Sequence, residues 1–102
     1  MIPVAMQFED QTFTYTSIER CGDLAIYCQE HKESQVQRFE VVRIRIRKAH
    51  TWPNGKTTPA HEAYPGAKRW GIDGFTHYTL EDAQAQMAEL VAKHDPVAVE
   101  EG

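Results

Sequence analysis

The sequence predicts an α+β fold, in which a three- to four-stranded antiparallel sheet (a meander) carries one C-terminal helix packed on one face. Two patterns predict it. Residues 35–48 end in a strict alternation of apolar and basic side chains, the two-residue period of a strand with one buried face. Residues 79–94 repeat apolar side chains every three to four positions, the period of an amphipathic helix.

The size and composition are those of one ordinary globular domain, covering residues 1–102. Of the 102 residues, 41% are hydrophobic and 25% are charged. No apolar run approaches the ~20 residues of a membrane span, and the N-terminus lacks the features of a secretory signal. We therefore expect a cytoplasmic protein. Cys21 and Cys28 match no common zinc spacing, so we expect free thiols and no metal site.

The first half of the chain predicts an N-terminal arm and then the meander. We expect a partly ordered arm at residues 1–11 and the three strands within 12–48, at residues 12–20, 24–29 and 35–48. Gly22 lies in the first turn, where it adopts a positive φ at little cost.

Residues 49–74 lose this periodicity and predict a long loop. Turn signals stand at Pro53-Asn54-Gly55 and at Tyr64-Pro65-Gly66. Long loops in small domains are usually functional or disordered, and aromatic residues argue against disorder. We expect Trp52, Tyr64 and Trp70 to pin an ordered loop, followed by a short fourth strand at 75–78.

The helix is defined by its ends and by its apolar stripe. Thr79 is a good N-cap, Asp82 lies in the first turn, and Pro96 stops the helix before a tail at 95–102. The stripe that should face the sheet consists of Leu80, Ala83, Met87, Leu90 and Val91. A row of alanines beside it (Ala85, Ala88 and Ala92) reflects helix propensity or could accept a second copy of the chain in a homodimer.

Charge is unevenly distributed along the chain. The net charge is −4 for residues 1–34, +5 for 35–74 and −5 for 75–102, which gives −4 overall. The central strand should bury Val42, Ile44 and Ile46 and present Arg43, Arg45 and Arg47 on the opposite face. This arginine ladder is either a solvated face, neutralised across the strands by Glu19 or Glu30, or a contact surface for carboxylates or phosphates.

Catalytic and cofactor motifs are not found in the sequence. There is no phosphate-binding glycine loop, nucleophile elbow or zinc-protease helix. His61 and Glu62 form the one neighbouring acid–base pair in the long loop, and a small enzyme built on them is the third alternative. A metal site from His50, His61 and His77 has unsuitable spacing. We expect no enzyme activity and no cofactor.

Several short motifs follow one another along the chain: Arg38-Phe39-Glu40-Val41-Val42-Arg43-Ile44-Arg45, Tyr64-Pro65-Gly66, Trp70-Gly71, Gly74-Phe75 and Thr79-Leu80-Glu81-Asp82-Ala83. Their order resembles that of small bacteriophage and prophage accessory proteins. This resemblance implies an accessory protein of a phage or mobile element that acts in the cytoplasm of a bacterial host. Such proteins include inhibitors of host defence, for example anti-CRISPR proteins.

The predicted three-stranded sheet, with Gly74-Phe75 before a threonine-capped helix, carries a second resemblance, in architecture, to the AP2-type DNA-binding domain. Gly74-Phe75 followed by Thr79-Leu80-Glu81-Asp82-Ala83 is similar to the junction before the helix of that family. There a three-stranded sheet enters the major groove with arginine and tryptophan side chains. The chain departs from that pattern in its long 49–74 segment and its acidic net charge.

We therefore predict a non-catalytic binding module. The partner is expected to be a host protein that the module binds and could inhibit, because a domain that neutralises many phosphates usually has a basic overall balance. A sheet that binds DNA is the alternative, and no membrane association is expected. The expected partner-binding residues are Arg43, Arg45, Arg47, Trp52, Tyr64 and Trp70.

Overall fold

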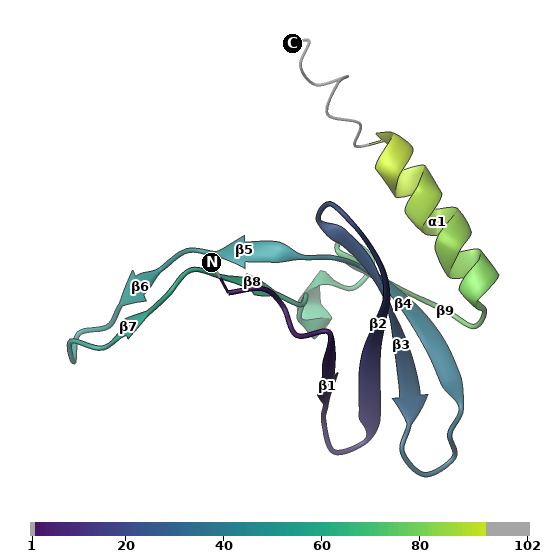
Figure 1. The fold of residues 1–102 in the computed structure, drawn as a ribbon, viewed down its shortest axis with the longest axis horizontal. Coiled ribbons are helices and arrows are strands. Elements are labelled where there is room, and N and C mark those ends of the chain that lie inside the picture. Colours follow the sequence, from purple (N-terminus) through teal and green to yellow (C-terminus); the bar gives the residue numbers. More distant parts are fainter. Residues whose placement is uncertain (1, 94–102) are drawn as a thin grey trace.

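The computed structural model describes residues 2–93 as an α+β fold with a projecting two-stranded arm (Figure 1). An antiparallel sheet of order β1-β2-β3-β4-β9 forms the body, and one helix packs on one of its faces. The strands of this sheet are β1 (Gln7–Glu9), β2 (Phe13–Cys21), β3 (Leu24–His31), β4 (Gln37–Arg43) and β9 (Gly74–His77). The remaining elements are β5 (Arg45–Arg47), β6 (His50–Thr51), β7 (Thr57–Thr58), β8 (His61–Ala63), the 3-10 turn η1 (Ala67–Arg69) and α1 (Leu80–Lys93).

The structure confirms the α+β class and the meander of β2, β3 and β4 with a helix on the sheet. Gly22 has φ +61° in the turn between β2 and β3. The strand expected at 75–78 is β9, which pairs with β4 in the register Val41↔Phe75. The sheet has five strands because residues at the N-terminus add β1 at its edge.

The N-terminal segment is therefore part of the fold, and the expected arm at residues 1–11 is wrong for the described residues 2–9. β1 pairs with β2 from Gln7↔Thr16 to Glu9↔Thr14. Upstream, the Tyr27 hydroxyl donates a hydrogen bond to the Ala5 carbonyl at 2.7 Å. The polar–apolar–polar triplet of β1 places one ring, Phe8, against the sheet and leaves its neighbours exposed, which is a strand pattern too short to stand out in the sequence.

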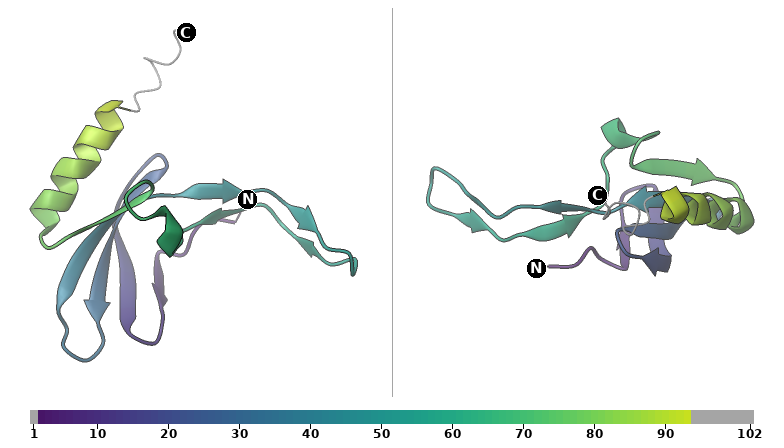
Figure 2. Two further views of the ribbon diagram at one scale, coloured as in Figure 1. Left: turned by 180° about the vertical axis from the view of Figure 1, so that it is seen from behind. Right: turned by 90° about the horizontal axis from the view of Figure 1, so that it is seen from above.

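The long central strand is interrupted at Ile44. β4 ends at Arg43, the Ile44 amide donates to the Asp23 carbonyl at 2.6 Å, and β5 then leaves the sheet to pair with β8. Figures 1 and 2 show this ribbon extending away from the body. The expected loop at 49–74 is thus largely a β-hairpin, and Ile46 is 60% exposed because β5 no longer has a sheet face to cover.

The body has one apolar cluster on each face of its sheet. Between α1 and the sheet, Ala83 and Met87 of the helix pack on Leu24, Ile26 and Val41 of the strands. Phe39, Leu80 and Leu90 pack around this cluster. The opposite face buries Ala25, Tyr27, Val42 and Ile44, covered by residues from the N-terminal segment and from the chain after the arm. The central strands are therefore apolar on both sides.

The helix begins as its sequence predicts. The Thr79 hydroxyl accepts a hydrogen bond from the Asp82 amide at 3.1 Å, and Glu81 and Asp82 occupy the first turn. The predicted stripe faces the sheet except for Val91, which is exposed. The expected stop at Pro96 and the tail lie outside the described residues. Within residues 2–93, the helix α1 is too short and too polar to cross a bilayer.

We predict that truncating the helix core destabilises the fold. Met87→Ala removes a buried side chain and should lower the unfolding free energy by ~2–5 kcal/mol, with Leu90→Ala at the lower end because Leu90 is only partly buried. Chemical denaturation measures both. Val91→Ala on the same helix is the control and should stay within about 0.5 kcal/mol of wild type. Equal midpoints for all three variants would contradict the packing of α1.

Candidate functional site

The arm comprises residues 45–63 and is a two-stranded ribbon. Its base is β5 paired with β8, from Arg45↔Ala63 to Arg47↔His61, and its outer part is β6 paired with β7. The tip is the predicted turn at Pro53-Asn54-Gly55, where Gly55 has φ +87°. The Asn54 side-chain oxygen accepts a hydrogen bond from the Lys56 amide at 3.0 Å. An isolated two-stranded hairpin is marginally stable in water, so the direction of the arm must be set at its base.

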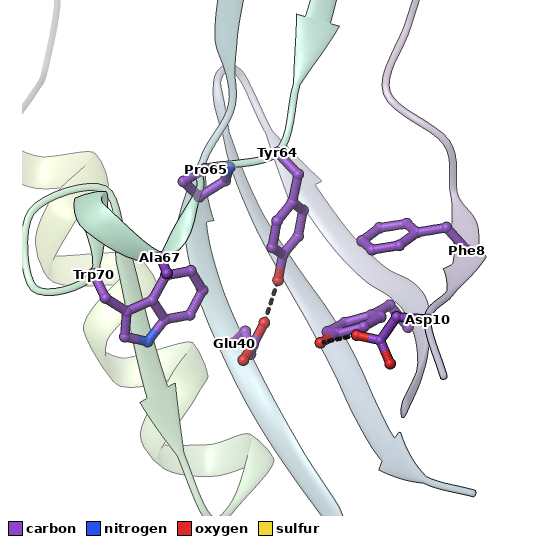
Figure 3. A pocket seen from close by; sticks show the side chains of 8 residues that line it. Phe8, Asp10, Glu40, Tyr64, Pro65, Ala67 and Trp70 are labelled. Atoms are coloured by element: carbon purple, nitrogen blue, oxygen red, sulfur yellow. Dashed lines mark hydrogen bonds between the residues drawn. The ribbon is translucent and has the colours of Figure 1, made fainter. Parts of the chain in front are cut away.

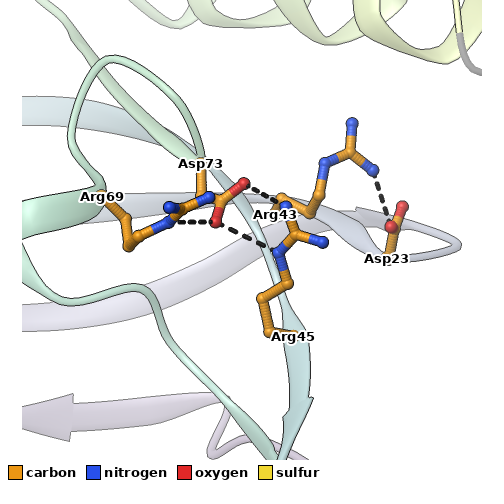
Figure 4. A network of polar contacts seen from close by, with 5 residues as sticks. All are labelled: Asp23, Arg43, Arg45, Arg69 and Asp73. Carbon is orange, nitrogen blue, oxygen red and sulfur yellow. Dashed lines mark hydrogen bonds and ion pairs between the residues drawn. The ribbon is translucent and has the colours of Figure 1, made fainter.

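A buried carboxylate, Asp73, fixes the first strand of the arm (Figure 4). It is 2% exposed and accepts a two-point contact from Arg45, through Nε at 3.1 Å and Nη2 at 2.8 Å. Arg69 donates a third bond through its Nε at 2.9 Å. Hydrogen bonds from Arg45 and Arg69 hold the pKa of Asp73 below its usual range despite burial.

A second carboxylate, Glu62, fixes the returning strand. Arg20 on β2 donates to both of its oxygens, at 3.3 Å and 3.0 Å, and the Val4 amide donates to Oε1 at 3.1 Å. The contact with Arg20 lowers the pKa of Glu62. Both carboxylate oxygens of Glu62 are thus hydrogen-bonded at the base of the arm. The ring Nδ1 of His61 lies 3.1 Å from the Pro59 carbonyl oxygen. This arrangement lends no support to a His61–Glu62 proton-transfer pair.

The three arginines do not form one exposed ladder: Arg45 and Arg47 are exposed, Arg43 is not, and two of the three are engaged in ion pairs. Arg43 is largely buried and pairs with Asp23 in the β2–β3 turn at 2.6 Å, and Arg45 pairs with Asp73. Neither uses Glu19 or Glu30. The β3–β4 register pairs Arg43 with Leu24, next to Asp23, and Arg45 reaches Asp73 from the start of β5. In the described part of the chain, Arg47 has no ion-pair partner and stays on the exposed arm.

The arm exposes apolar and basic side chains together. Ile46 is 60% exposed and Trp52 is 50% exposed, with its indole Nε1 donating to Thr58 at 3.0 Å. Trp52 was expected to pin a loop. It lies instead on the arm, which projects from the body, so its ring does not pack on the sheet. The arm carries four bases and one acid, a net charge of +3, which leaves −7 for the rest of a chain whose total is −4.

A pocket of about 360 Å³ opens on the face of the sheet opposite α1 (Figure 3). Its walls are aromatic: the rings of Phe8 and Tyr15 stack at 4.7 Å, Phe8 meets Tyr64 edge-on at 5.1 Å, and Tyr64 lies 6.4 Å from Trp70. The residues that line it are Phe8, Asp10, Tyr15, Glu40, Tyr64, Pro65, Ala67 and Trp70.

A buried glutamate forms the polar floor of this pocket. Glu40 is 5% exposed, and its Oε1 accepts a hydrogen bond from the Tyr64 hydroxyl. Burial raises the pKa of Glu40, and the hydrogen bond from Tyr64 only partly offsets this. Burial and the nearby Glu40 carboxylate raise the pKa of Tyr64 strongly, so Tyr64 remains a donor.

Trp70 is held in place by a glycine and a threonine. Its indole Nε1 donates to Thr76 on β9 at 3.0 Å. Its ring lies so close to Gly74 that a Cβ added there would stand 2.5 Å from the ring carbons. Gly74 is therefore required by the close approach of the indole.

The structure divides the predicted site residues among three places. Arg43 and Arg45 stabilise the junction between body and arm, whereas Arg47 and Trp52 lie on the arm. Tyr64 and Trp70, expected to pin the chain, do pack on the sheet face and line the pocket. Sequence reasoning missed the other pocket residues that matter here, which are Phe8, Asp10, Tyr15 and Glu40.

One signal in the sequence could have revealed Glu40. It stands between Phe39 and Val41 and next to Val42, so both faces of this strand carry apolar residues. A strand that is apolar on both faces is covered on both faces, and a carboxylate within it must be buried.

The described residues offer no assembled metal site, because within residues 2–93 no three His, Cys, Asp or Glu side chains cluster suitably. Cys21 and Cys28 are free thiols. Comparisons of the chain with profiles of known protein families, with curated proteins and with solved structures found no match. The geometry of the arm and of the pocket is what indicates a function.

We predict that Arg45 and Arg47 differ in their effect on stability. Arg45→Ala leaves the buried Asp73 with Arg69 alone and should lower the unfolding free energy by about 1–2 kcal/mol, since Arg45 is itself half-exposed. Arg47→Ala is the matched control and should change it by less than about 0.5 kcal/mol. Denaturant titration of both variants measures the difference, and equal effects would contradict the anchoring role of Asp73.

We predict a pH-dependent gain in stability for Glu40→Gln. Glutamine can still accept the Tyr64 hydrogen bond but carries no charge. Because burial raises the pKa of Glu40 in the folded state, its neutral form favours folding below the ordinary value of 4.5, and this advantage is lost as pH rises through the folded-state pKa. Tyr64, Tyr15 and Asp10 face the same pocket and are unchanged in the variant.

Unfolding midpoints measured at several pH values report this difference. Glu40→Gln should gain stability relative to wild type as pH rises and then level off. A constant difference, or a loss that grows with pH, would contradict a buried carboxylate with a raised pKa.

Proposed function

We propose that this protein is a non-catalytic binding module that docks on an acidic surface of a partner protein through its arm. The observation that carries the proposal is the combination of exposed Ile46 and Trp52 with basic residues on a ribbon that extends from the body (Figure 2). Aromatic, aliphatic and arginine side chains together are the composition of interface cores. Arg47, Lys48 and Lys56, which form no ion pairs among residues 2–93, supply the charge.

The anchoring at the arm base favours tight docking. Arg45 bound to Asp73 and Arg20 bound to Glu62 set the direction of both strands before a partner arrives. A preorganised surface loses less conformational entropy on binding than a mobile loop does. The opposite charges of arm and body also orient the molecule, because an acidic partner attracts the arm and repels the body.

The resemblance to phage and prophage accessory proteins supports a host protein as the partner, which the module would bind and could inhibit in a bacterial cytoplasm. Binding alone is sufficient for inhibition when the docked module covers a surface that the host protein needs.

DNA binding is the second candidate, because a basic two-stranded ribbon has dimensions that the major groove admits. Two observations weigh against it. The arm offers only three bases without an ion pair in the described structure, fewer than the phosphate contacts that usually support binding. The remainder of the chain, with net charge −7, would repel the flanking backbone.

Removal of the outer arm tests the proposal. Arg47 and His61 are paired neighbours, so an Asn-Gly turn can join them in place of residues 48–60 and keep the base intact. Affinity capture from bacterial lysate should retain a protein partner with the full chain and lose it with the trimmed variant. Trp52→Ala should weaken binding of the purified partner by ~2 kcal/mol or more, as interface hot spots do.

Charge-matched controls and a DNA titration complete the test. Arg47→Ala should weaken capture, whereas Lys93→Ala at the end of α1 should not. Duplex DNA should bind no more tightly than roughly the micromolar range of non-specific sites at physiological salt. Submicromolar, steeply salt-dependent DNA binding that is lost on trimming would favour the second candidate, and capture unaffected by trimming would exclude the arm altogether.

A further inference from the structure

We propose that the aromatic pocket on the face opposite α1 is a second binding site, one that takes the ammonium group of a lysine side chain from a partner protein. The site is separate from the arm and carries the opposite charge. The proposal does not depend on the function proposed for the arm. It depends on the pairing of ring faces with a buried carboxylate that has one oxygen free.

The walls of the pocket suit an organic cation. Phe8, Tyr15, Tyr64 and Trp70 contribute rings from four different parts of the chain. Ring faces attract a cation through their quadrupole, most strongly where water is excluded, and sites that bind ammonium groups are built from such rings. A lysine side chain also has a four-carbon stem that an apolar wall can cover.

The floor supplies the negative charge. Glu40 Oε1 is bound by the Tyr64 hydroxyl, whereas Oε2 accepts no hydrogen bond from the described residues. In those residues no fully buried polar side-chain atom lacks a partner, so Oε2 keeps some solvent exposure, and Glu40 is one of the residues that line the pocket. A carboxylate that is 95% covered, with one oxygen open to an aromatic pocket, lacks a counter-charge that an ammonium group would supply.

The second acid stands at the rim. Asp10 also lines the pocket (Figure 3), and its Oδ1 is held by the amides of Thr12 at 2.8 Å and Phe13 at 2.7 Å. These backbone hydrogen bonds lower the pKa of Asp10, so it is ionised at neutral pH. With carboxylates at floor and rim, the pocket disfavours anionic ligands such as nucleotides, although its rings could otherwise stack on a base.

The open oxygen favours lysine over arginine. A guanidinium group gains most from a two-point contact with both oxygens of a carboxylate, as Arg45 makes with Asp73. At Glu40, Oε1 already accepts the Tyr64 hydroxyl, which leaves Oε2 as the oxygen without a donor among the described residues. A compact ammonium group, which acts as a point charge, matches a single acceptor better.

The test uses Trp70 fluorescence in the full chain. Trp70 lines the pocket, and Trp52→Phe removes the other tryptophan of the sequence, which lies on the arm. The probes are N-acetyl-lysine methylamide, its ε-trimethyl form, the arginine analogue, the uncharged norleucine analogue and AMP. We expect saturable changes with both lysine probes, weaker binding of arginine, and no binding of norleucine or AMP.

Two pocket variants separate charge from shape. Glu40→Gln keeps the side-chain volume and the acceptor for Tyr64, and should weaken lysine binding by about tenfold or more. Phe8→Leu keeps an apolar wall and removes a ring face, so it should weaken binding of the lysine probes, while norleucine should still show no binding. Circular dichroism and denaturant unfolding establish whether each variant folds. If one of the two variants does not fold, binding to the other variant decides the test.

The outcomes are distinct. Lysine binding that requires Glu40 and Phe8 supports the proposal. Equal binding of norleucine, tighter binding of arginine or AMP, or no response to any lysine probe would each overturn it. Because the probes are small and the reporter lies in the pocket, loss of this site leaves docking by the arm untouched, and failure of arm docking leaves this result unchanged.

Discussion

The buried carboxylate of Asp73 is the interaction on which the shape of the molecule depends. The chain leaves the sheet at Ile44, which would leave a loosely held hairpin if nothing tied it down. Asp73 prevents this by joining Arg45 at the root of the arm to Arg69 in η1, while its backbone carbonyl accepts the Arg43 amide at 2.7 Å. One residue therefore connects the end of β4, the start of the arm and the segment that leads to the pocket. A buried ion is costly unless it is fully paired, and three charge-assisted bonds provide that pairing.

The two candidate surfaces follow from this junction. The ribbon removes the basic residues from the body, so the body becomes strongly acidic and the arm basic. Where the ribbon returns, Tyr64 and Trp70 fold over the sheet face that α1 does not cover. There they meet Phe8 and Tyr15 from the N-terminal side and close a pocket around Glu40. A single departure of the chain from its sheet thus yields an exposed basic arm and an acidic aromatic pocket, and the opposite charges suit different partner groups.

The sequence predicted the elements whose signal is local. The helix, its Thr79 cap, the stripe with Met87 and Leu90, and the meander all follow from periodicity and turn residues, and the structure confirms them. The break at Ile44 could not be predicted, because alternation continues without interruption from Val42 to Arg47. What ends the strand is non-local: Asp23 takes the Ile44 amide, and Asp73 takes the Arg45 side chain. The pocket could not be predicted for the same reason: Phe8, Glu40 and Trp70 come from distant parts of the chain and are brought together only in the folded structure.

The distance distribution between arm and body tests the central claim, that the arm is a fixed projection held at its base by Asp73. Spin labels at Lys56 in the tip turn and at Lys93 on α1, in a chain whose Cys21 and Cys28 are replaced by serine, allow it to be measured by pulsed electron paramagnetic resonance. The account predicts one narrow distribution in the free protein, which broadens when Asp73→Asn removes the charge that holds Arg45 and Arg69. A broad distribution that is the same with and without the Asp73 carboxylate would contradict it.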